Sequence, residues 1–443
     1  MTHEMIKSFF TSAVQHVAAS IAQYAVDPLK DFTRSRKLPP DLLITFLVTQ
    51  GSSSTKNELA DFFGLDASMP TESALVKQRA KLKPEALEAV FKEFHSLAAS
   101  ASSRADGEVE LIAADGSSFT FFSKPEFSPD DYFVGEGHSA KGFYNIHTNA
   151  LYNLKTNLYE DAFLQPVHGK DEYRAFCTMV DRFETRDGRK AIFIGDIGYC
   201  SYNNMAHVIK NGQYFLFRTK DIHSKGPAAN FDYPNDGAFD VTVKATLVRS
   251  HSRKLPPIEG YRRFIDKATS FDFIEYGPLD TFELSFRIVR FPLTDTTYEC
   301  IVTNLPAEEY PPEKLKEYYF ARWGIESSFR KLKYTVGLSN FHAYKPESIQ
   351  QEIWAKLTAY NVTEMLVSQT VLEEKQRKHA YKVNFSRAAH ICRKFLYPVE
   401  REKPIDISAL LSRELIPIRD GRQYARLKTA HFRKPKYVIY RAA

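Results

Sequence analysis

Two aspartates, each beside a glycine, stand where short apolar segments end. Asp115 closes the segment VELIAAD and precedes Gly116, and Asp196 closes RKAIFIGD directly after Gly195. Both segments are typical of buried strands, and side chains at strand ends can converge on a ligand while the sheet holds them in place. Two facing carboxylates repel unless a cation lies between them, and such cation-bridged carboxylates serve phosphoryl transfer. Taken singly, either aspartate also fits a turn former or a helix N-cap.

A third carboxylate lies in a segment of helical periodicity, YFARWGIESSFRKLK (319–333). With about 100° per residue, one sector roughly 60° wide holds four of its polar side chains. These are Tyr319, Arg322, Glu326 and Lys333. A carboxylate flanked by two cations and a phenol can hold a metal ion and grip phosphates. The alternative is a surface helix with an Arg322–Glu326 ion pair worth a few tenths of a kcal/mol.

The elements that must position these residues follow one another in a mixed pattern. The chain reads as helical to about residue 100, and SLAASASSRADGEVE (96–110) is typical of a linker. The segments FYNIHTNALYN (143–153) and TNLYEDAFLQP (156–166) alternate like two antiparallel strands, and helical and strand segments follow to about 220. A strand-rich stretch then precedes a second helical part, which begins at about 311. This order predicts an α/β protein.

Two short helices in the N-terminal part resemble a helix-turn-helix. They are TKNELADFFGL (55–65), closed by Gly64, and TESALVKQRAKL (71–82), which Pro70 and Thr71 open. The second would present a basic face to DNA phosphates. Its cations are Lys77, Arg79, Lys81 and Lys83. An ordinary helical hairpin with a solvated basic face fits the pattern equally well.

The formal net charge of +6 is unevenly distributed. From Lys375 to the C-terminus there are 18 Lys and Arg against 5 Asp and Glu, so the rest of the chain is mildly acidic. Tyr424, Phe432, Tyr437 and Tyr440 lie among these cations. Rings between cations suit contacts with bases as well as phosphates, so the segment favours a polyanionic partner. A solvated, charge-rich tail is the alternative.

Composition excludes several classes of protein. A hydrophobic fraction of 43% supports packed cores and argues against a disordered chain. There is no apolar run of the roughly 18 residues that a membrane span needs, and the start of the sequence shows no signal peptide. The four cysteines lie far apart without a CxxC pair, which fits a reducing compartment. We therefore expect a cytoplasmic protein without membrane contact.

With these residues in view, the chain resembles the DDE transposases of bacterial insertion sequences, in the IS4 family. That family is marked by a Tyr-x2-Arg-x3-Glu-x6-Lys helix, which YFARWGIESSFRKLK matches without a gap. Its first aspartate lies in a strand end like ADGSSF, and its second lies in a strand followed by glycine and an aromatic residue, as in GDIGY. The resemblance runs through the whole chain.

The resemblance implies a ribonuclease-H-like catalytic core with a β-rich insertion, a helical N-terminal DNA-binding region and a basic helical C-terminal region. The corresponding ranges are 1–100 for the DNA-end-binding region, 101–220 and 306–374 for the two parts of the core, 221–305 for the insertion and 375–443 for the basic region. It also implies a homodimer on double-stranded DNA, associated with the bacterial nucleoid when bound.

The implied activity is cut-and-paste transposition, in which Mg²⁺, or Mn²⁺ as a substitute, supports strand cleavage at terminal inverted repeats and strand transfer to target DNA. The residues assigned to catalysis and metal binding are Asp115, Asp196 and Glu326, and those assigned to DNA phosphates are Tyr319, Arg322 and Lys333. In relatives that form hairpins, an aromatic residue of the insertion holds a flipped base. The sequence does not choose among Tyr261, Phe264, Phe271, Phe273 and Tyr276.

Three other functions compete with this one. A ribonuclease-H-like nuclease would cleave without joining strands, and a domesticated DNA-binding derivative would keep the fold without catalysis. The intact set of three carboxylates speaks against the second. Paired carboxylates also occur in glycosidases, but the cations flanking Glu326 make that reading poor. His138, His147 and His207 show no metal-ligand spacing with a cysteine and are expected to be loop or satisfied core residues.

Overall fold

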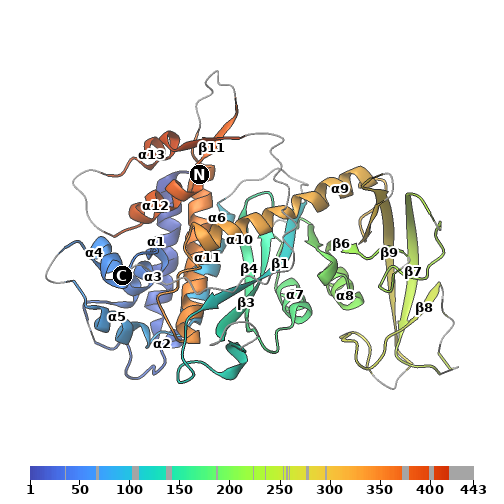
Figure 1. Ribbon diagram of the computed structural model, residues 1–443, viewed down its shortest axis with the longest axis horizontal. Coiled ribbons are helices and arrows are strands. Elements are labelled where there is room, and N and C mark those ends of the chain that lie inside the picture. The colour runs from blue at the N-terminus through green and yellow to red at the C-terminus, as the bar shows by residue number, and fades with distance from the viewer. Residues whose placement is uncertain are drawn as a thin grey trace.

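In a computed structural model of the chain, a bundle of helices lies beside a large mixed sheet (Figure 1). The described residues are 1–34, 36–65, 69–101, 109–135, 142–185, 188–222, 224–234, 236–252, 254–255, 258, 260–275, 279–294, 297–371, 379–398 and 404–418. They form a mixed α/β protein, as the sequence predicts.

The main sheet has 10 strands in the order β2-β3-β1-β5-β6-β10-β9-β7-β8, with β4 paired to β3. β1 pairs antiparallel with β3 and parallel with β5, and β5 pairs parallel with β6. The strands are β1 (Glu110–Phe121), β2 (Phe133–Val134), β3 (Phe143–Asn153), β4 (Leu158–Pro166), β5 (Ala191–Gly195), β6 (Tyr214–Thr219), β7 (Phe239–Val248), β8 (Tyr261–Phe264), β9 (Thr281–Pro292) and β10 (Tyr298–Thr303). The predicted antiparallel pair is confirmed as β3 and β4.

Strand β1 does not end at Asp115, as the sequence suggested, but continues to Phe121. The reason is its antiparallel partner β3, which pairs with it from Ile112 onward to Phe121 and so carries it past the end of β5. Glycine at position 116 allows β1 and β3 to pair closely here, because a Cβ would lie only 2.7 Å from His147 Nε2 on β3. The second strand was predicted to end at Asp196, and β5 ends one residue earlier, at Gly195.

Helices cover both faces of the sheet near β1 and β5. On one face, α7 (Glu172–Asp181) and α8 (Tyr202–Lys210) bury Phe176 and Met205 against Phe193 of β5. On the other, α10 (Trp323–Tyr334) and α11 (Pro346–Ser368) pack Phe329 and Tyr360 onto Tyr159 of β4. Helix α9 (Pro312–Ala321) precedes α10 (Figure 1), and its buried side chains pack against residues of β5, β6 and β10.

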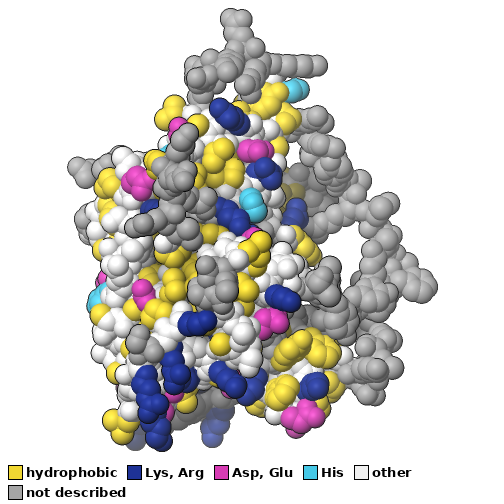
Figure 2. Space-filling model, turned by 90° about the vertical axis from the view of Figure 1, so that its left-hand side faces the viewer, with side chains coloured by type: hydrophobic (Ala, Val, Ile, Leu, Met, Phe, Trp, Pro, Cys, Tyr) yellow, Lys and Arg dark blue, Asp and Glu magenta, His cyan; other side chains and the backbone are white. Residues whose placement is uncertain are grey.

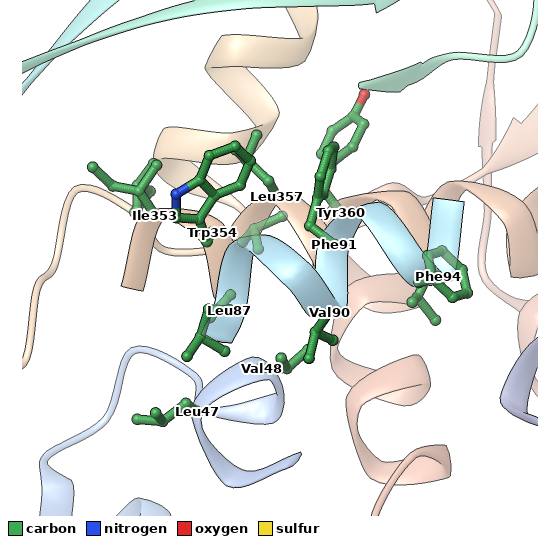
Figure 3. Packing of buried hydrophobic residues seen from close by; sticks show 14 of the residues in the cluster. Leu47, Val48, Leu87, Val90, Phe91, Phe94, Ile353, Trp354, Leu357 and Tyr360 are labelled. Atoms are coloured by element: carbon green, nitrogen blue, oxygen red, sulfur yellow. The ribbon is translucent and has the colours of Figure 1, made fainter. Parts of the chain in front are cut away.

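The helical region is built around α11 (Figure 1). Figure 3 shows Trp354 and Leu357 of α11 packed with Phe91 and Val90 of α6 and Val48 of α3. The N-terminal helices are α1 (His3–Ala19), α2 (Ile21–Tyr24), α3 (Pro40–Thr49), α4 (Thr55–Phe63), α5 (Glu72–Arg79) and α6 (Glu85–Ser100). The predicted linker is partly wrong, because α6 extends to Ser100 and buries Ala98.

The two helices of the expected helix-turn-helix are confirmed as α4 and α5. Ser54 and Thr71 cap their N-termini by accepting backbone N–H bonds, and Gly64 follows α4 with a φ of 76°. Beyond α11 the described chain forms β11 (Tyr381–Val383), α12 (Phe385–Phe395), α13 (Ile407–Arg413) and β12 (Leu415–Pro417). The aromatic residues interleaved with cations after residue 418 lie outside the described residues.

The strand-rich stretch between 221 and 305 holds β7 to β10. It continues the sheet instead of forming a separate one, because β10 pairs antiparallel with β6. Within the described part of the chain, no helix is long and apolar enough to cross a membrane.

Candidate active site

Asp115 and Asp196 are brought together by the parallel pairing of β1 and β5. The register places Ala113 of β1 beside Ile194 of β5. Two residues further along each segment, Asp115 and Asp196 therefore point to the same face of the sheet. This face carries helices α9 and α10, since Ile194 packs in the cluster that includes Leu315 and Tyr319 of α9. The two aspartates therefore lie side by side beneath the predicted catalytic helix.

Glu326 reaches this face from the first turn of α10. The predicted continuous helix over 319–333 is interrupted, because α9 ends at Ala321 and α10 begins at Trp323. Arg322 between them keeps helical dihedrals, and tight i→i+3 bonds on both sides join the two helices. The expected i,i+4 contact survives, with Arg322 Nη2 donating to Glu326 Oε1 at 3.1 Å.

The three carboxylates interact electrostatically. The pKa of Asp115 is raised to about 6, mainly because the side chain is buried, and Asp196 and Glu326 raise it further. The Gly116 N–H, which donates to Asp115 Oδ1 at 2.9 Å, and the Arg322 guanidinium oppose this shift. A buried carboxylate near two others is an arrangement that a bound cation would stabilise.

The donor set fits a hard divalent cation in chemistry, although the carboxylates take separate partners. Asp196 Oδ1 accepts from Gly198 N at 2.8 Å in the short 3₁₀ turn η2 (Ile197–Tyr199), and Glu326 is held by Arg322. Among the described residues, no group of three or more His, Cys, Asp or Glu side chains is arranged as a ready metal site. Oxygen ligands from carboxylates are nevertheless the ones that Mg²⁺ and Mn²⁺ prefer.

The remaining residues of the predicted helix lie in different surroundings. Arg322 is only 5% exposed, and its Nε has no hydrogen-bond partner. Tyr319 is 3% exposed and packs in the core beside Arg322, so it does not lie on an open surface. Lys333 is half-buried, with its ammonium 5.1 Å from the centre of the Phe119 ring on β1.

The predicted DNA contacts of the second short helix divide into two kinds. Lys77 is exposed, and Lys81 is half-buried with Asp31 4.0 Å away. The prediction that Arg79 faces solvent is wrong, because it is 6% exposed and its Nη1 lies 3.0 Å from Glu352 Oε1 on α11. Helix α5 is packed against α11 on that side, and the arginine satisfies the buried carboxylate there.

Figure 2 shows Lys and Arg side chains gathered at the lower end of the face formed by the N-terminal helices. Lys77 is exposed, and the segment before α3 carries other exposed cations. These are Lys30, Arg34, Arg36 and Lys37. The sequence pattern did not single out this segment, because it lacks helical periodicity and its cations are spaced irregularly.

Two polar residues near Asp115, His147 and Tyr199, were not predicted to belong to the site. His147 of β3 is buried, contacts Ser118 through Nδ1 at 3.1 Å and lies 3.2 Å from Glu172 Oε1, which helps to lower the pKa of Glu172 to about 2. Tyr199 is buried with a hydroxyl that has no partner, and this burial raises its pKa well above the ordinary value, with a smaller contribution from Asp115 and Asp196. The sequence signal for Tyr199 was present in GDIGY, but its role could not be assigned from one aromatic letter.

The histidines otherwise agree with expectation. His147 is a core residue, and His207 contacts Asp181 at 2.8 Å and Asp272 at 2.9 Å. His138 lies outside the described residues. Of the aromatic candidates in the insertion, Phe264 is exposed and stacks on His251 at 3.9 Å between ring centres, whereas Phe271 is buried. Tyr276 lies outside the described residues.

Replacing Asp115 by asparagine is expected to stabilise the protein in the absence of divalent cations. Because the folded pKa of about 6 exceeds the ordinary 3.8, the folded wild type binds more protons in that range, and its stability falls as pH rises from about 4 to 6. At pH 8 the free energy of unfolding of the variant should therefore be about 1–3 kcal/mol higher than that of the wild type, and the difference should vanish near pH 4. Urea unfolding with EDTA at both pH values measures this, and a difference independent of pH would contradict it.

Comparison of the sequence with known proteins identifies its family. Residues 107–362 match the family described as "Transposase DDE domain". The transposase for insertion sequence element IS231F of Bacillus thuringiensis subsp. israelensis is 22% identical over 262 residues, which are 53% of this chain and 52% of that relative. Transposase InsG for insertion sequence element IS4 of Escherichia coli is 24% identical over 134 residues, 29% of each chain.

The alignment thus spans about half the length of the first of these relatives. Among solved structures, a piggyBac transposase in a synaptic complex with hairpin DNA aligns with 89% of this chain and 79% of its own, at 11% identity and a TM-score of 0.42. The family match includes Asp115, Asp196 and Glu326 and extends over more than half of the sequence. The chain therefore belongs to the transposase DDE domain family.

Proposed function

We propose that this protein is a DNA transposase, which binds the terminal inverted repeats of an insertion sequence and performs metal-dependent strand cleavage and strand transfer. The observation that carries the proposal is the convergence of Asp115, Asp196 and Glu326 on one face of the sheet from β1, the end of β5 and α10. Family membership supports it, since DDE transposases generally use divalent metal ions. The strand order β4-β3-β1-β5-β6, three antiparallel strands followed by two parallel ones, supports a ribonuclease-H-like core.

In this proposal the three carboxylates hold divalent cations, with Mg²⁺ as the ion used and Mn²⁺ as a substitute. Such cations supply Lewis acidity toward the phosphodiester and toward the attacking oxygen. The chain itself fixes the ligands. β1 and β5 hold Asp115 and Asp196 in register, and Arg322 orients Glu326 through its hydrogen bond. The one site serves both cleavage and joining, because each is an in-line displacement at phosphorus.

Arg322 and Lys333 are proposed to contact phosphates of the element end. Arg322 offers an unpartnered Nε beside the carboxylates, and Lys333 lies over Phe119 two helical turns after Glu326. Tyr319, which is buried, is proposed to hold the Arg322 guanidinium, 5.7 Å from its ring centre. An arginine fixed in this way loses little conformational freedom when it binds a phosphate.

The helical region 1–100 is proposed to bind the DNA end through Lys77, Lys81 and the exposed cations near them. The face formed by the N-terminal helices carries Lys and Arg side chains at its lower end (Figure 2), and Lys77 is exposed. Residues 375–443 are proposed to add contacts to DNA or to a second subunit, because their excess of cations suits a polyanion. We propose that a homodimer on DNA holds two DNA ends together. Because its substrate is bacterial DNA, the protein is proposed to act in the cytoplasm at the nucleoid.

The test is cleavage and joining of a DNA duplex that bears the terminal repeat flanking the gene. The wild type with Mg²⁺ should release a 3′-OH at the end of the repeat and join it to a second duplex, whereas Glu326→Gln should do neither. Cleavage without any joined product would favour a nuclease. Specific binding without cleavage by the wild type would overturn catalysis and leave a DNA-binding derivative.

A further inference from the structure

A cavity of about 120 Å³ lies in the helical region, apart from the three carboxylates. It is lined by residues from the end of α3, the loop that follows it, the C-terminal end of α10, the middle of α11 and one side of α12. Thr335, which lines it, lies nine residues after Glu326, about 13 Å further along the axis of α10. The volume is well above the roughly 10–15 Å³ that one water needs.

Two residues that line this cavity carry buried hydrogen-bond donors without acceptors. Gln50 is 3% exposed, and its Nε2 has no partner. Arg393 Nε, from α12, is also buried without a partner, although Arg393 Nη1 lies 3.5 Å from Glu58 Oε2. Buried donors are normally satisfied, because an unpaired one costs about 1–3 kcal/mol. Both residues line the cavity, so a ligand with hydrogen-bond acceptors that reached them would satisfy these donors.

The charge of the lining favours an anion. Lys356 and Arg393 supply two cations, and none of the lining residues is an aspartate or glutamate. Lys356 is 2% exposed and donates from Nζ to the backbone carbonyl of Gln50. Burial lowers the pKa of Lys356 to about 8, whereas Glu352 and Glu58 raise it. A bound anion would stabilise this buried ammonium further.

Glu58, one of the two carboxylates that act on Lys356, is already engaged by the loop. It accepts from Gly51 N and Ser53 N, both at 2.8 Å, so that its negative charge is directed toward the backbone and Arg393. Gly51 is required for this arrangement, because a Cβ there would collide with the Arg393 guanidinium. The loop and Arg393 thus form one wall of the cavity.

The rim of the cavity carries hydroxyl groups. Ser52, Thr335 and Ser386 lie around its opening, and Ser386 Oγ is 3.4 Å from Thr335 Oγ1. Ser386 and His390 are exposed, so the cavity opens on the side of α12. Hydroxyl, amide and guanidinium donors around a cationic floor match a tetrahedral oxyanion, which presents several acceptor oxygens at once.

We propose that this cavity, defined by Gln50, Lys356, Ser386 and Arg393, binds a single phosphoryl group. Two sources share this chemistry, namely free inorganic phosphate and a backbone phosphate of bound DNA. The second source rests on the proposed function, whereas the first does not. Either way the group would tie α12 to α3 and α11, and so connect the C-terminal part of the described chain with the end of the helix that bears Glu326.

The first experiment titrates the full-length protein with inorganic phosphate in chloride buffer of constant ionic strength, with EDTA present. Isothermal titration calorimetry and the thermal unfolding midpoint are the readouts. Saturable binding is expected for the wild type. Gln50→Met removes the donor but keeps the backbone carbonyl that Lys356 uses, and should weaken binding about tenfold. Gln369→Met, a change of the same chemistry at the end of α11, should bind like the wild type.

Ser386→Ala, on the exposed rim, is a second variant for the case in which Gln50→Met does not fold, and it should weaken binding severalfold. Absence of saturable phosphate binding, or equal binding by the wild type and the folded variants, would overturn the proposal and leave a cavity filled by water. Asp196→Asn should bind phosphate normally, which separates failure at this site from failure of the catalytic proposal.

The DNA arm distinguishes the two sources. If a backbone phosphate occupies the cavity, phosphate should compete with binding of the terminal-repeat duplex, and Gln50→Met should weaken that binding and reduce its salt slope. If only free phosphate occupies it, Gln50→Met should bind DNA like the wild type while losing phosphate affinity.

Discussion

Replacing Asp196 by asparagine is expected to slow Mg²⁺-dependent strand cleavage by about 10³-fold or more. Asparagine keeps the shape of the side chain and can still accept from Gly198 N, but it removes one of three negative charges on this face of the sheet. Loss of charge at a site that organises cations and developing charge typically costs at least two to three orders of magnitude. A thousandfold loss corresponds to about 4 kcal/mol of transition-state stabilisation.

The measurement is the single-turnover rate of nicking at the end of the terminal repeat, at saturating protein. Asp280→Asn, an exposed aspartate before β9, is the matched control and should cleave at the wild-type rate. Thermal unfolding in EDTA shows whether Asp196→Asn is folded. A folded variant that retained more than a tenth of the wild-type rate would remove Asp196 from the proposed site.

The parts of the site that the sequence predicted are those that depend on local pattern. The apolar strands before Asp115 and Asp196 are present, and the spacing of Arg322 and Glu326 gives the expected contact. Their convergence depends on β1 pairing parallel with β5, which a short strand pattern cannot specify. The continuation of β1 past Asp115 was missed for a similar reason, because it depends on the pairing of β1 with β3, which lies later in the chain.

Burial was the property that the sequence predicted least well. Tyr319 shares a helical sector with Arg322 and Glu326, but the packing of α9 on the sheet buries it. The cavity near Gln50 was also invisible, because its residues come from helices separated by about 300 positions in the sequence. Such clusters are set by tertiary packing and leave no periodic signal.

Arg79→Met is expected to destabilise the protein by about 3–5 kcal/mol, and it is the case in which sequence and structure assign a residue opposite roles. In addition to Glu352, the guanidinium contacts Gln351 through Nε at 2.7 Å. Glu352 is 2% exposed and also accepts from the backbone N–H of His342. Removing the arginine therefore leaves a buried carboxylate without its cation, the circumstance in which a broken buried ion pair is most costly.

Chemical unfolding at pH 7.5 measures this loss, and Lys77→Met on the same helix is the control. Lys77 is exposed, so its replacement should change stability by no more than about 0.5 kcal/mol. Under the proposed function, Lys77→Met should instead weaken binding of the element end and lower the salt slope by about 1. Stability and DNA binding are thus expected to separate between two basic residues only two positions apart.

The double variant Arg79→Met/Glu352→Gln tests whether charge causes the loss. Glutamine removes the uncompensated charge and can still accept from His342 N, so the double variant should be more stable than Arg79→Met alone. A double variant that is less stable than either single one would mean that packing, not charge, dominates here. If Arg79→Met were as stable as Lys77→Met and lost DNA affinity to the same extent, the arginine would belong to the DNA-binding face. The ion pair would then not be what joins α5 to α11.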